Sequence, residues 1–147
     1  MNNILIEVPY EDSNNDLKLE SVEVVPYETN YKVVHTPFFA SNLAYGDLIT
    51  IEKDGEKYYY EKHVKISDYS TIQIVFFDEN IIPNTKTKLE SLGCSCCIML
   101  GKPYISVSIP PEVDYSLIHE YLQKQEKEKV SSYKEACLSE KHSNENT

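Results

Sequence analysis

The sequence contains no arginine, and this absence narrows the functions open to it. All 14 basic residues are lysine, against 24 aspartate and glutamate residues, which gives a formal net charge of -10. Arginine supplies the bidentate contacts that proteins make to phosphate and guanine, and nucleic-acid binding draws most of its affinity from neutralised phosphates. We therefore expect no nucleic-acid partner.

Long apolar runs are also missing. Hydrophobic residues make up 41% of the chain, but no run approaches the roughly 20 apolar residues that a helix needs to cross a bilayer. The N-terminal segment "MNNILIEVPYED" lacks the basic stretch and apolar block of a signal peptide. We expect a cytoplasmic protein with no membrane partner.

The common catalytic and phosphate-binding motifs are absent as well. The segment "DGEK" lacks the Gly-x-x-x-x-Gly-Lys spacing of a phosphate loop, and there is no H-E-x-x-H or paired-carboxylate motif. The sequence predicts no catalytic residue and no cofactor.

Four cysteines are present, Cys94, Cys96, Cys97 and Cys137. Without a secretion signal, disulfides are not expected. In a strand, Cys94 and Cys96 share one face while Cys97 points the other way, so these thiols do not converge on an ion as C-x-x-C pairs do. We predict core packing and no metal site. One alternative stays open, in which Cys97 or Cys137 beside His119 serves a thiol-dependent enzyme or small-ligand sensor with its site between the two halves.

Strand patterns dominate the first half of the chain. Residues 20–37 predict two strands joined across "ETN", and residues 47–66 predict a hairpin whose Asp54-Gly55 dipeptide suits a type I′ turn. Alternation divides this hairpin into two faces. The buried set is Ile49, Ile51, Tyr58, Tyr60, Val64 and Ile66, and the outward set is Tyr59, Glu61, His63 and Lys65.

The stretch "HTPFFASNLAYGDLITI", residues 35–51, lies between the two strand pairs. Burying Phe38 and Phe39 contributes on the order of 3 to 5 kcal/mol, enough to hold a loop over the end of a sheet. Gly46 permits a turn, and Asp47 can accept hydrogen bonds from nearby backbone N–H groups.

From residue 70 on, strand and helix patterns alternate. The predicted elements are a strand (70–77), a helix (84–93), two strands (94–100 and 103–109), a helix (114–129) and a strand (130–138). Asn84 or Thr85 is expected to cap the first helix and Gly93 to end it. Asp114 is expected to cap the second helix, whose predicted apolar face is Leu117, Ile118, Tyr121 and Leu122.

These patterns predict an α+β fold in which a small antiparallel β-barrel-like sheet packs on a ferredoxin-like βαββαβ unit. The predicted parts are a barrel-like subdomain (1–68), a ferredoxin-like subdomain (69–138) and a disordered tail (139–147). No Gly/Pro-rich spacer separates the first two parts, so we expect them to pack together.

The chain resembles the bacterial family called domain of unknown function 4265. The segments that carry the resemblance are "YKVVHTPFFASNLAYGDLITIE", "LESLGC", "ISVSIPPEVDYSLIHEYL" and "YKEACL". Together they cover roughly residues 4 to 138. Family members usually have tryptophan where this chain has Tyr133. The resemblance implies a fold and a bacterial origin but no activity and no catalytic residue.

The N-terminal segment is strongly acidic, with seven carboxylates in residues 1–31 against Lys18 alone. Such a segment attracts a basic partner, and tyrosine is favoured at interfaces, although acidic loops also serve solubility and tyrosine also suits strands. The sequence predicts an acidic binding protein, most concretely an immunity-type or antitoxin-like inhibitor of a basic toxin or nuclease domain. The predicted partner-binding residues are Glu11, Asp12, Asp16, Glu20, Glu23, Glu28, Tyr59 and Glu61.

Overall fold

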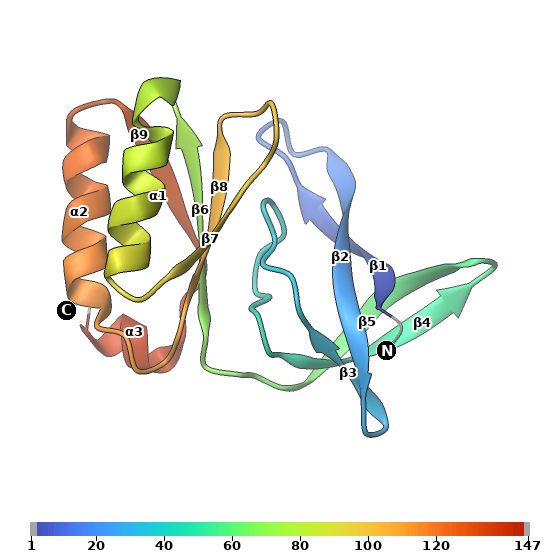
Figure 1. The fold of residues 1–147 in the computed structure, drawn as a ribbon. Helices are drawn as coiled ribbons and strands as arrows, with labels where there is room; N and C mark the ends of the chain where they lie inside the picture. Colours follow the sequence, from blue (N-terminus) through green and yellow to red (C-terminus); the bar gives the residue numbers. More distant parts are fainter. Residues whose placement is uncertain (1–2, 146–147) are drawn as a thin grey trace.

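The computed structural model describes residues 3–145 and has the predicted α+β class, with two largely antiparallel sheets on opposite sides (Figure 1). The first sheet contains β1 (Ile4–Glu11), β2 (Leu17–Tyr27), β3 (Asn30–Val33), β4 (Leu48–Asp54) and β5 (Lys57–Lys65). Each strand pairs antiparallel with the next, and β5 returns to β1 through one parallel bridge between Glu7 and Tyr59. The strand order therefore closes on itself.

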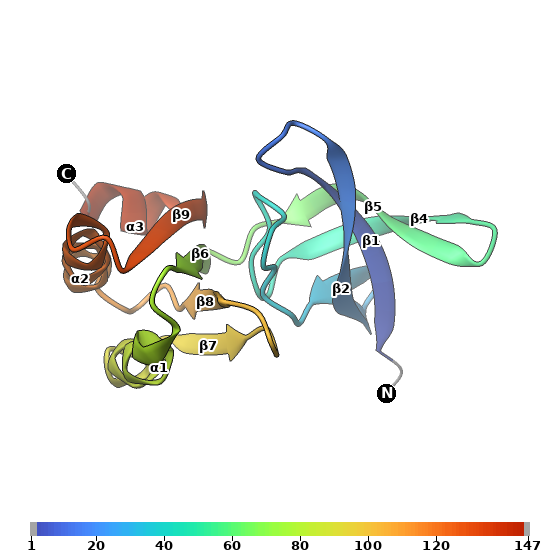
Figure 2. The same ribbon diagram turned by 90° about the horizontal axis from the view of Figure 1, so that it is seen from above.

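The second sheet has the strand order β7-β8-β6-β9. Its strands are β6 (Ser70–Phe76), β7 (Ser95–Ile98), β8 (Tyr104–Ile109) and β9 (Ser131–Cys137). Its helices are α1 (Ile82–Ser91), which follows the 3-10 turn η1 (Glu79–Ile81), α2 (Tyr115–Lys127) and α3 (Glu140–Glu145). Helices α1 and α2 cover the face turned away from the first sheet (Figure 2). The predicted order strand, helix, strand, strand, helix, strand is confirmed.

Each sheet has its own hydrophobic core. In the first, alternate residues of β1 and β2 point inward, so Ile6, Val8, Val22 and Val24 are buried together. In the second, the helix-facing side of the sheet packs on the two helices; this core includes Ile72, Ile74, Ile105, Val107, Leu89, Ile118 and Leu122. The predicted boundary between residues 68 and 69 falls in the connection between β5 and β6.

Helix α2 begins where the sequence predicts. The Asp114 carboxylate accepts the backbone N–H two residues further on, at 2.9 Å. Ile118 and Leu122 are buried as expected, but Leu117 is 55% exposed. Tyr115 is fully buried instead, because the first helical residue already faces the sheet.

Helix α1 begins earlier than predicted, and neither Asn84 nor Thr85 caps it. It starts at Ile82, directly after η1, with Pro83 in its first turn, where the fixed φ of proline suits a helix start. Thr85 is buried within the helix and accepts a hydrogen bond from Gln125 Nε2 at 2.9 Å.

The β4–β5 turn also differs from the prediction. Asp54 pairs with Lys57, so the two loop residues are Gly55 and Glu56, and of these only Gly55 has a positive φ, at 65°. Glycine at the first loop position is the pattern of a type II′ turn, not type I′.

Two irregularities in the β4–β5 pairing change the predicted faces of β5 between Glu61 and Val64, while Tyr58 and Tyr60 face the core as predicted. The register shifts between Leu48 and Ile49 and again between Thr50 and Ile51. Each extra residue in a bulge reverses which face the following side chains occupy. As a result His63, predicted outward, is half-buried, and Val64, predicted inward, is the extra residue of one irregularity and is 50% exposed. Ile66, also predicted inward, lies beyond the end of β5 and is 62% exposed. These three assignments were wrong.

The predicted disordered tail contains ordered structure. Helix α3 lies within it, and His142 is fully buried, with its Nδ1 2.6 Å from Ser70 Oγ. The Nε2 of His142 donates to the carbonyl of Pro110 at 3.1 Å. The polar composition of the tail gave no sign that His142 is buried, because two of its partners, Ser70 and Pro110, lie far from it in the sequence. The last two residues of the predicted tail lie outside the described part of the chain.

None of the helices in the described residues is long and apolar enough to cross a membrane.

The turn after α1 gives a first test. Gly93, the predicted stop, has φ +103°, and a Cβ there would lie 2.8 Å from Val113 Cγ2; Gly101, with φ +73°, faces open space. We expect Gly101→Ala to lower the free energy of unfolding by about 1–2 kcal/mol, the cost of left-handed backbone strain. Gly93→Ala should lower it by more, because it adds a clash with Val113 to the same strain. Urea denaturation measures both; equal losses would contradict this packing.

Candidate functional site

The segment between β3 and β4, residues 34–47, lies between the two sheets and is called the junction loop below (Figure 1). The carboxylate of Glu20, on β2, holds its centre. It accepts the backbone N–H groups of Phe38 at 2.7 Å, Phe39 at 3.0 Å and Ala40 at 2.9 Å. Hydrogen bonds to an ionised acceptor are the strong ones. Glu20 was predicted to bind a partner, but its carboxylate is engaged inside the molecule.

Asp47 holds the end of the junction loop. Its side chain is 2% exposed and accepts the N–H of Ala44 at 3.0 Å, the N–H of Ser67 at 2.9 Å and a bond from His63 Nε2 at 2.8 Å. The other ring nitrogen of His63 lies 2.7 Å from the Tyr60 hydroxyl. The expectation that Asp47 accepts backbone N–H bonds is confirmed.

The second sheet holds the junction loop from the other side. Gln73 Nε2 donates to the carbonyl of Ala40 at 2.8 Å, and Thr71 Oγ1 donates to the carbonyl of Leu43 at 2.8 Å. Both side chains belong to β6 and are buried. The contact between the sheets is therefore partly polar, made by side chains that satisfy the backbone of the loop.

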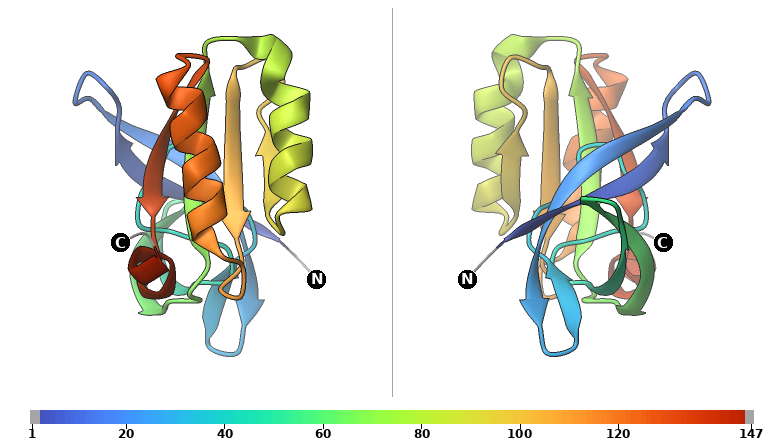
Figure 3. Two further views of the ribbon diagram at one scale, coloured as in Figure 1. Left: turned by 90° about the vertical axis from the view of Figure 1, so that its left-hand side faces the viewer. Right: turned by 90° about the vertical axis from the view of Figure 1, so that its right-hand side faces the viewer.

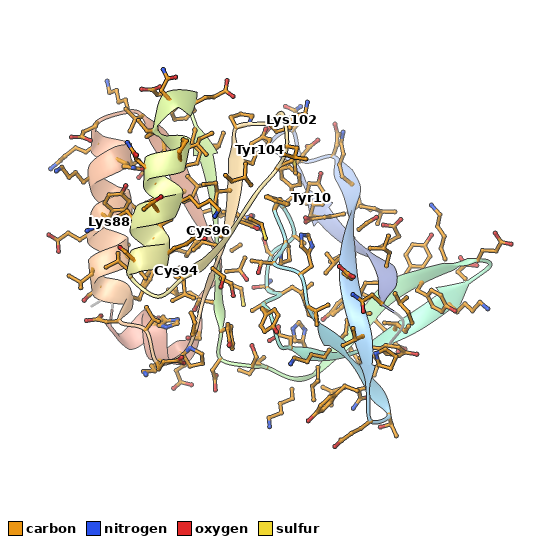
Figure 4. The ribbon with its side chains drawn as sticks, viewed as in Figure 1. Tyr10, Lys88, Cys94, Cys96, Lys102 and Tyr104 are labelled. Carbon is orange, nitrogen blue, oxygen red and sulfur yellow. The ribbon has the colours of Figure 1, made fainter. Side chains whose placement is uncertain are left out.

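An aromatic cluster completes the junction. The ring of Phe39 stacks on Tyr10 of β1 at 5.4 Å between centroids and meets Tyr104 of β8 edge-on at 5.3 Å. Figure 4 shows Tyr10 and Tyr104 on the two sides of the junction. Phe39 thus joins both sheets, and Phe38 and Phe39 are half-buried rather than fully buried.

The outer face of the β1–β2 pair carries both carboxylates and exposed leucines. Because the even-numbered residues Ile6, Val8, Val22 and Val24 fill the core, the odd-numbered residues point to solvent. We call this outer face the acidic–leucine ribbon; it consists of Leu5, Glu7, Pro9, Glu11, Leu17, Leu19, Ser21 and Glu23. Across the strands Leu5 lies opposite Glu23, Pro9 opposite Leu19 and Glu11 opposite Leu17.

The three leucines of the ribbon are exposed to 65% (Leu5), 74% (Leu17) and 50% (Leu19). Figure 3 shows β1 and β2 running across the side of the molecule turned away from the helices. Neighbouring exposed apolar residues rimmed by polar ones mark interaction surfaces. The sequence prediction missed Leu17 and Leu19 because its predicted strand began at residue 20, whereas β2 begins at Leu17.

The eight predicted partner-binding residues do not form one surface. Glu11 and Glu23 lie on the ribbon, and the Glu23 carboxylate accepts a bond from Asn3 Nδ2. Asp12 and Asp16 lie in the β1–β2 turn, at the opposite end of β2 from Glu28 (Figure 1). Asp12 accepts the N–H of Asp16, which lowers its pKa.

The last two predicted residues lie on β5. Tyr59 is half-buried and meets Glu7 of the ribbon through the β1–β5 bridge. Glu61 is exposed and accepts a hydrogen bond from Thr50 Oγ1 at 2.8 Å. Tyr59 therefore borders the ribbon.

The cysteines divide as the strand pattern predicts. Cys94 is buried and Cys96 half-buried beside the second core (Figure 4), while Cys97 is exposed. Burial raises the pKa of Cys94 and of Cys96 to about 12, and that of Cys137 to about 11. Within residues 3–145, no group of three or more His, Cys, Asp or Glu side chains is placed to hold a metal ion.

The imidazole of the predicted thiol and imidazole pair, that of His119, contacts a carboxylate. His119 lies beside Glu135, with 4.0 Å between Nε2 and Oε2. Cys137 instead lines a cavity of about 240 Å³ between the two sheets, together with Asp47 and His63. Both ring nitrogens of His63 make hydrogen bonds to other side chains, Asp47 and Tyr60.

Comparison with known proteins agrees with this fold. Residues 20–133 match the profile of the domain of unknown function DUF4265. The chain belongs to the DUF4265 family. It is also similar to a solved structure described as a hypothetical protein from Neisseria gonorrhoeae, with 26% identity, a TM-score of 0.84, and coverage of 95% of this chain and 97% of that one. No functionally curated protein matches the chain.

The role of Glu20 gives a second test. Replacing Glu20 with Gln removes the charge from an acceptor of three N–H groups, and we expect the free energy of unfolding to fall by about 1–2 kcal/mol. Glu11→Gln, on the exposed ribbon, is the matched control and should change it by less than about 0.5 kcal/mol. Equal effects in chemical denaturation would show that Glu20 does not hold the loop.

Thiol reactivity gives a third test. At pH 8, three units below a pKa of about 11, only about one Cys137 thiol in a thousand is ionised, and Cys94 and Cys96 less still. Ellman's reagent should therefore label one thiol per folded chain quickly, the exposed Cys97, and none in Cys97→Ser. Fast labelling of Cys137 in the folded protein would favour the thiol-dependent alternative.

Proposed function

We propose that this protein is a small acidic cytoplasmic binding protein, an immunity-type or antitoxin-like inhibitor that neutralises a basic toxin or nuclease domain by direct binding. The observation that carries the proposal is the acidic–leucine ribbon, in which exposed leucines alternate with carboxylates on an uncovered sheet face. Buried apolar anchors supply most of the energy of a protein interface, while charges at the rim steer the partner and reject others.

The charges of the ribbon set the chemistry of the partner. Glu7, Glu11 and Glu23 lie among the leucines, and Lys57 is the nearest cation to Glu7, at 3.9 Å. A partner that covers this face must bring basic groups to the carboxylates and apolar groups to the leucines. A basic amphipathic surface of a toxin or nuclease domain meets both needs.

We also propose the finer architecture that the sequence predicts. The closed strand order of β1 to β5 supports a small barrel. The order β7-β8-β6-β9, with both long helices on one face, supports a ferredoxin-like unit. In this arrangement the junction loop is the layer between the two units, and the Pro9–Glu11 end of the ribbon lies close to Ser41 and Asn42 of that loop.

A second candidate function rests on the cavity between the sheets. Its lining includes Cys137, His63 and Tyr69, and a small-ligand sensor would bind there. At about 240 Å³ it is smaller than the roughly 300 to 1,000 Å³ of ligand pockets. The raised pKa of Cys137 and the occupied nitrogens of His63 make it the weaker proposal.

The inhibitor proposal is tested with the product of the gene beside its own, since inhibitors of this kind are encoded next to their targets. We expect that product to be basic, to be toxic when expressed alone, and to be harmless when co-expressed with this chain. Calorimetry should show direct binding that weakens as salt is raised. A neighbour that neither binds nor is neutralised would contradict the proposal.

Ribbon variants then locate the interface. Leu17→Ser and Leu19→Ser should each weaken binding at least tenfold, because each removes a buried anchor. Leu117→Ser is the matched control, since Leu117 is exposed to a similar degree on α2, and it should leave the affinity unchanged. An equal loss in the control, or none in the ribbon variants, would place the interface elsewhere.

A further inference from the structure

The two edges of the second sheet differ in their protection. At one edge, β9 carries Lys134 and Glu135, and the carbonyl of Ala136 accepts the N–H of Asn42 from the junction loop at 2.8 Å. At the other edge, β7 pairs only with β8 among the described strands, and it is the outermost strand of the sheet (Figure 2). Only the β7 edge is open to another strand.

The sequence around β7 lacks the features that keep edge strands from pairing. Residues 91–101 contain no charged residue, in a chain of which 26% is charged. Natural edge strands are usually blunted by lysine, proline or inward charges. Ile98 and Leu100 are 38% and 92% exposed at the end of this strand. An uncharged, apolar edge of this kind favours strand addition.

The direction of the backbone at each residue of β7 determines which N–H and carbonyl groups can bond to a further strand. Met99 N–H donates to the Tyr104 carbonyl, and the antiparallel register pairs Cys97 with Ser106. Because backbone groups alternate in direction along a strand, those of Cys97 face β8 with those of Met99. The N–H and carbonyl groups of Cys96 and Ile98 therefore face the open edge.

We propose that two copies of this chain associate through antiparallel pairing of their β7 strands, about a two-fold axis at Cys97. In this register Cys96 of each copy exchanges hydrogen bonds with Ile98 of the other. If the pairing were shifted toward the N-terminal end of β7, it would need the N–H of Cys94. That N–H already donates to the Leu89 carbonyl at 3.1 Å. A two-fold axis makes the interface self-complementary and closes the assembly at two copies.

This register places the two Cys97 residues directly opposite each other in a non-hydrogen-bonded pair. The Cα atoms in such a pair lie about 4.5 Å apart, within the about 4.4–6.8 Å range that a disulfide spans. Cys97 is exposed in the single chain. Diamide, a mild oxidant, should therefore join the copies, accepting two electrons and two protons as the two thiols form one S–S bond.

The first experiment is a concentration series by sedimentation velocity with diamide cross-linking. We expect a dimer fraction that rises with concentration, and a cross-linked dimer on non-reducing gels that Cys97→Ser abolishes and Cys137→Ser retains. A monomer at all concentrations, or cross-linking that persists in Cys97→Ser, would overturn the proposal.

A charge swap tests the register itself. Cys97→Lys and Cys97→Glu each place like charges opposite each other in the dimer, so each alone should raise the dimer dissociation constant at least tenfold. An equal mixture of the two variants should restore association as a heterodimer. Leu117→Lys on α2 is the control and should leave the dimer unchanged. Dimerisation of either charged variant alone, or no recovery in the mixture of folded variants, would exclude this axis.

Discussion

The fold depends on the hydrogen bonds that pair the backbone N–H and carbonyl groups of one irregular segment, the junction loop. The junction loop lies between two sheets, where an unpaired N–H group would be costly. Two carboxylates supply the acceptors: Glu20 takes three consecutive N–H groups and Asp47 takes two more together with an imidazole. From the other side, β6 side chains donate to the carbonyls of the loop. With its polar groups paired in this way, the loop can bring Phe39 against both Tyr10 and Tyr104.

The acidic residues therefore form two groups, one that faces into the molecule and one that faces solvent. Those that face inward hold the sheets together and are not available to a partner. Those that face outward on β1 and β2 stand beside exposed leucines, where the basic groups of a partner can reach them. A count of net charge alone does not separate the two groups, yet the separation decides which acids belong to the proposed interface. The β7 edge, uncharged and on the other sheet, is a distinct surface, so self-association leaves the ribbon open.

Much of the fold followed from local patterns in the sequence. The α+β class, the order of elements after residue 70, the Asp114 cap and the bond from the Ala44 N–H to Asp47 all depend on neighbours a few residues apart. Several of the errors share a non-local cause. Bulges in the β4–β5 pairing turned His63 inward, Glu20 found its partners in a loop about 20 residues away, and His142 found its partners on β6 and in the connection before α2. The leucines of the ribbon became visible only once the register of β1 and β2 was known.

Amide hydrogen exchange at the junction loop tests the central claim most directly. If the Glu20 carboxylate holds this loop, the amide protons of Phe38, Phe39 and Ala40 should exchange as slowly as those of the paired strands, although no backbone carbonyl accepts them. Exchange at the rate of the exposed β7–β8 turn would show that the loop is not held by Glu20 and would contradict the account.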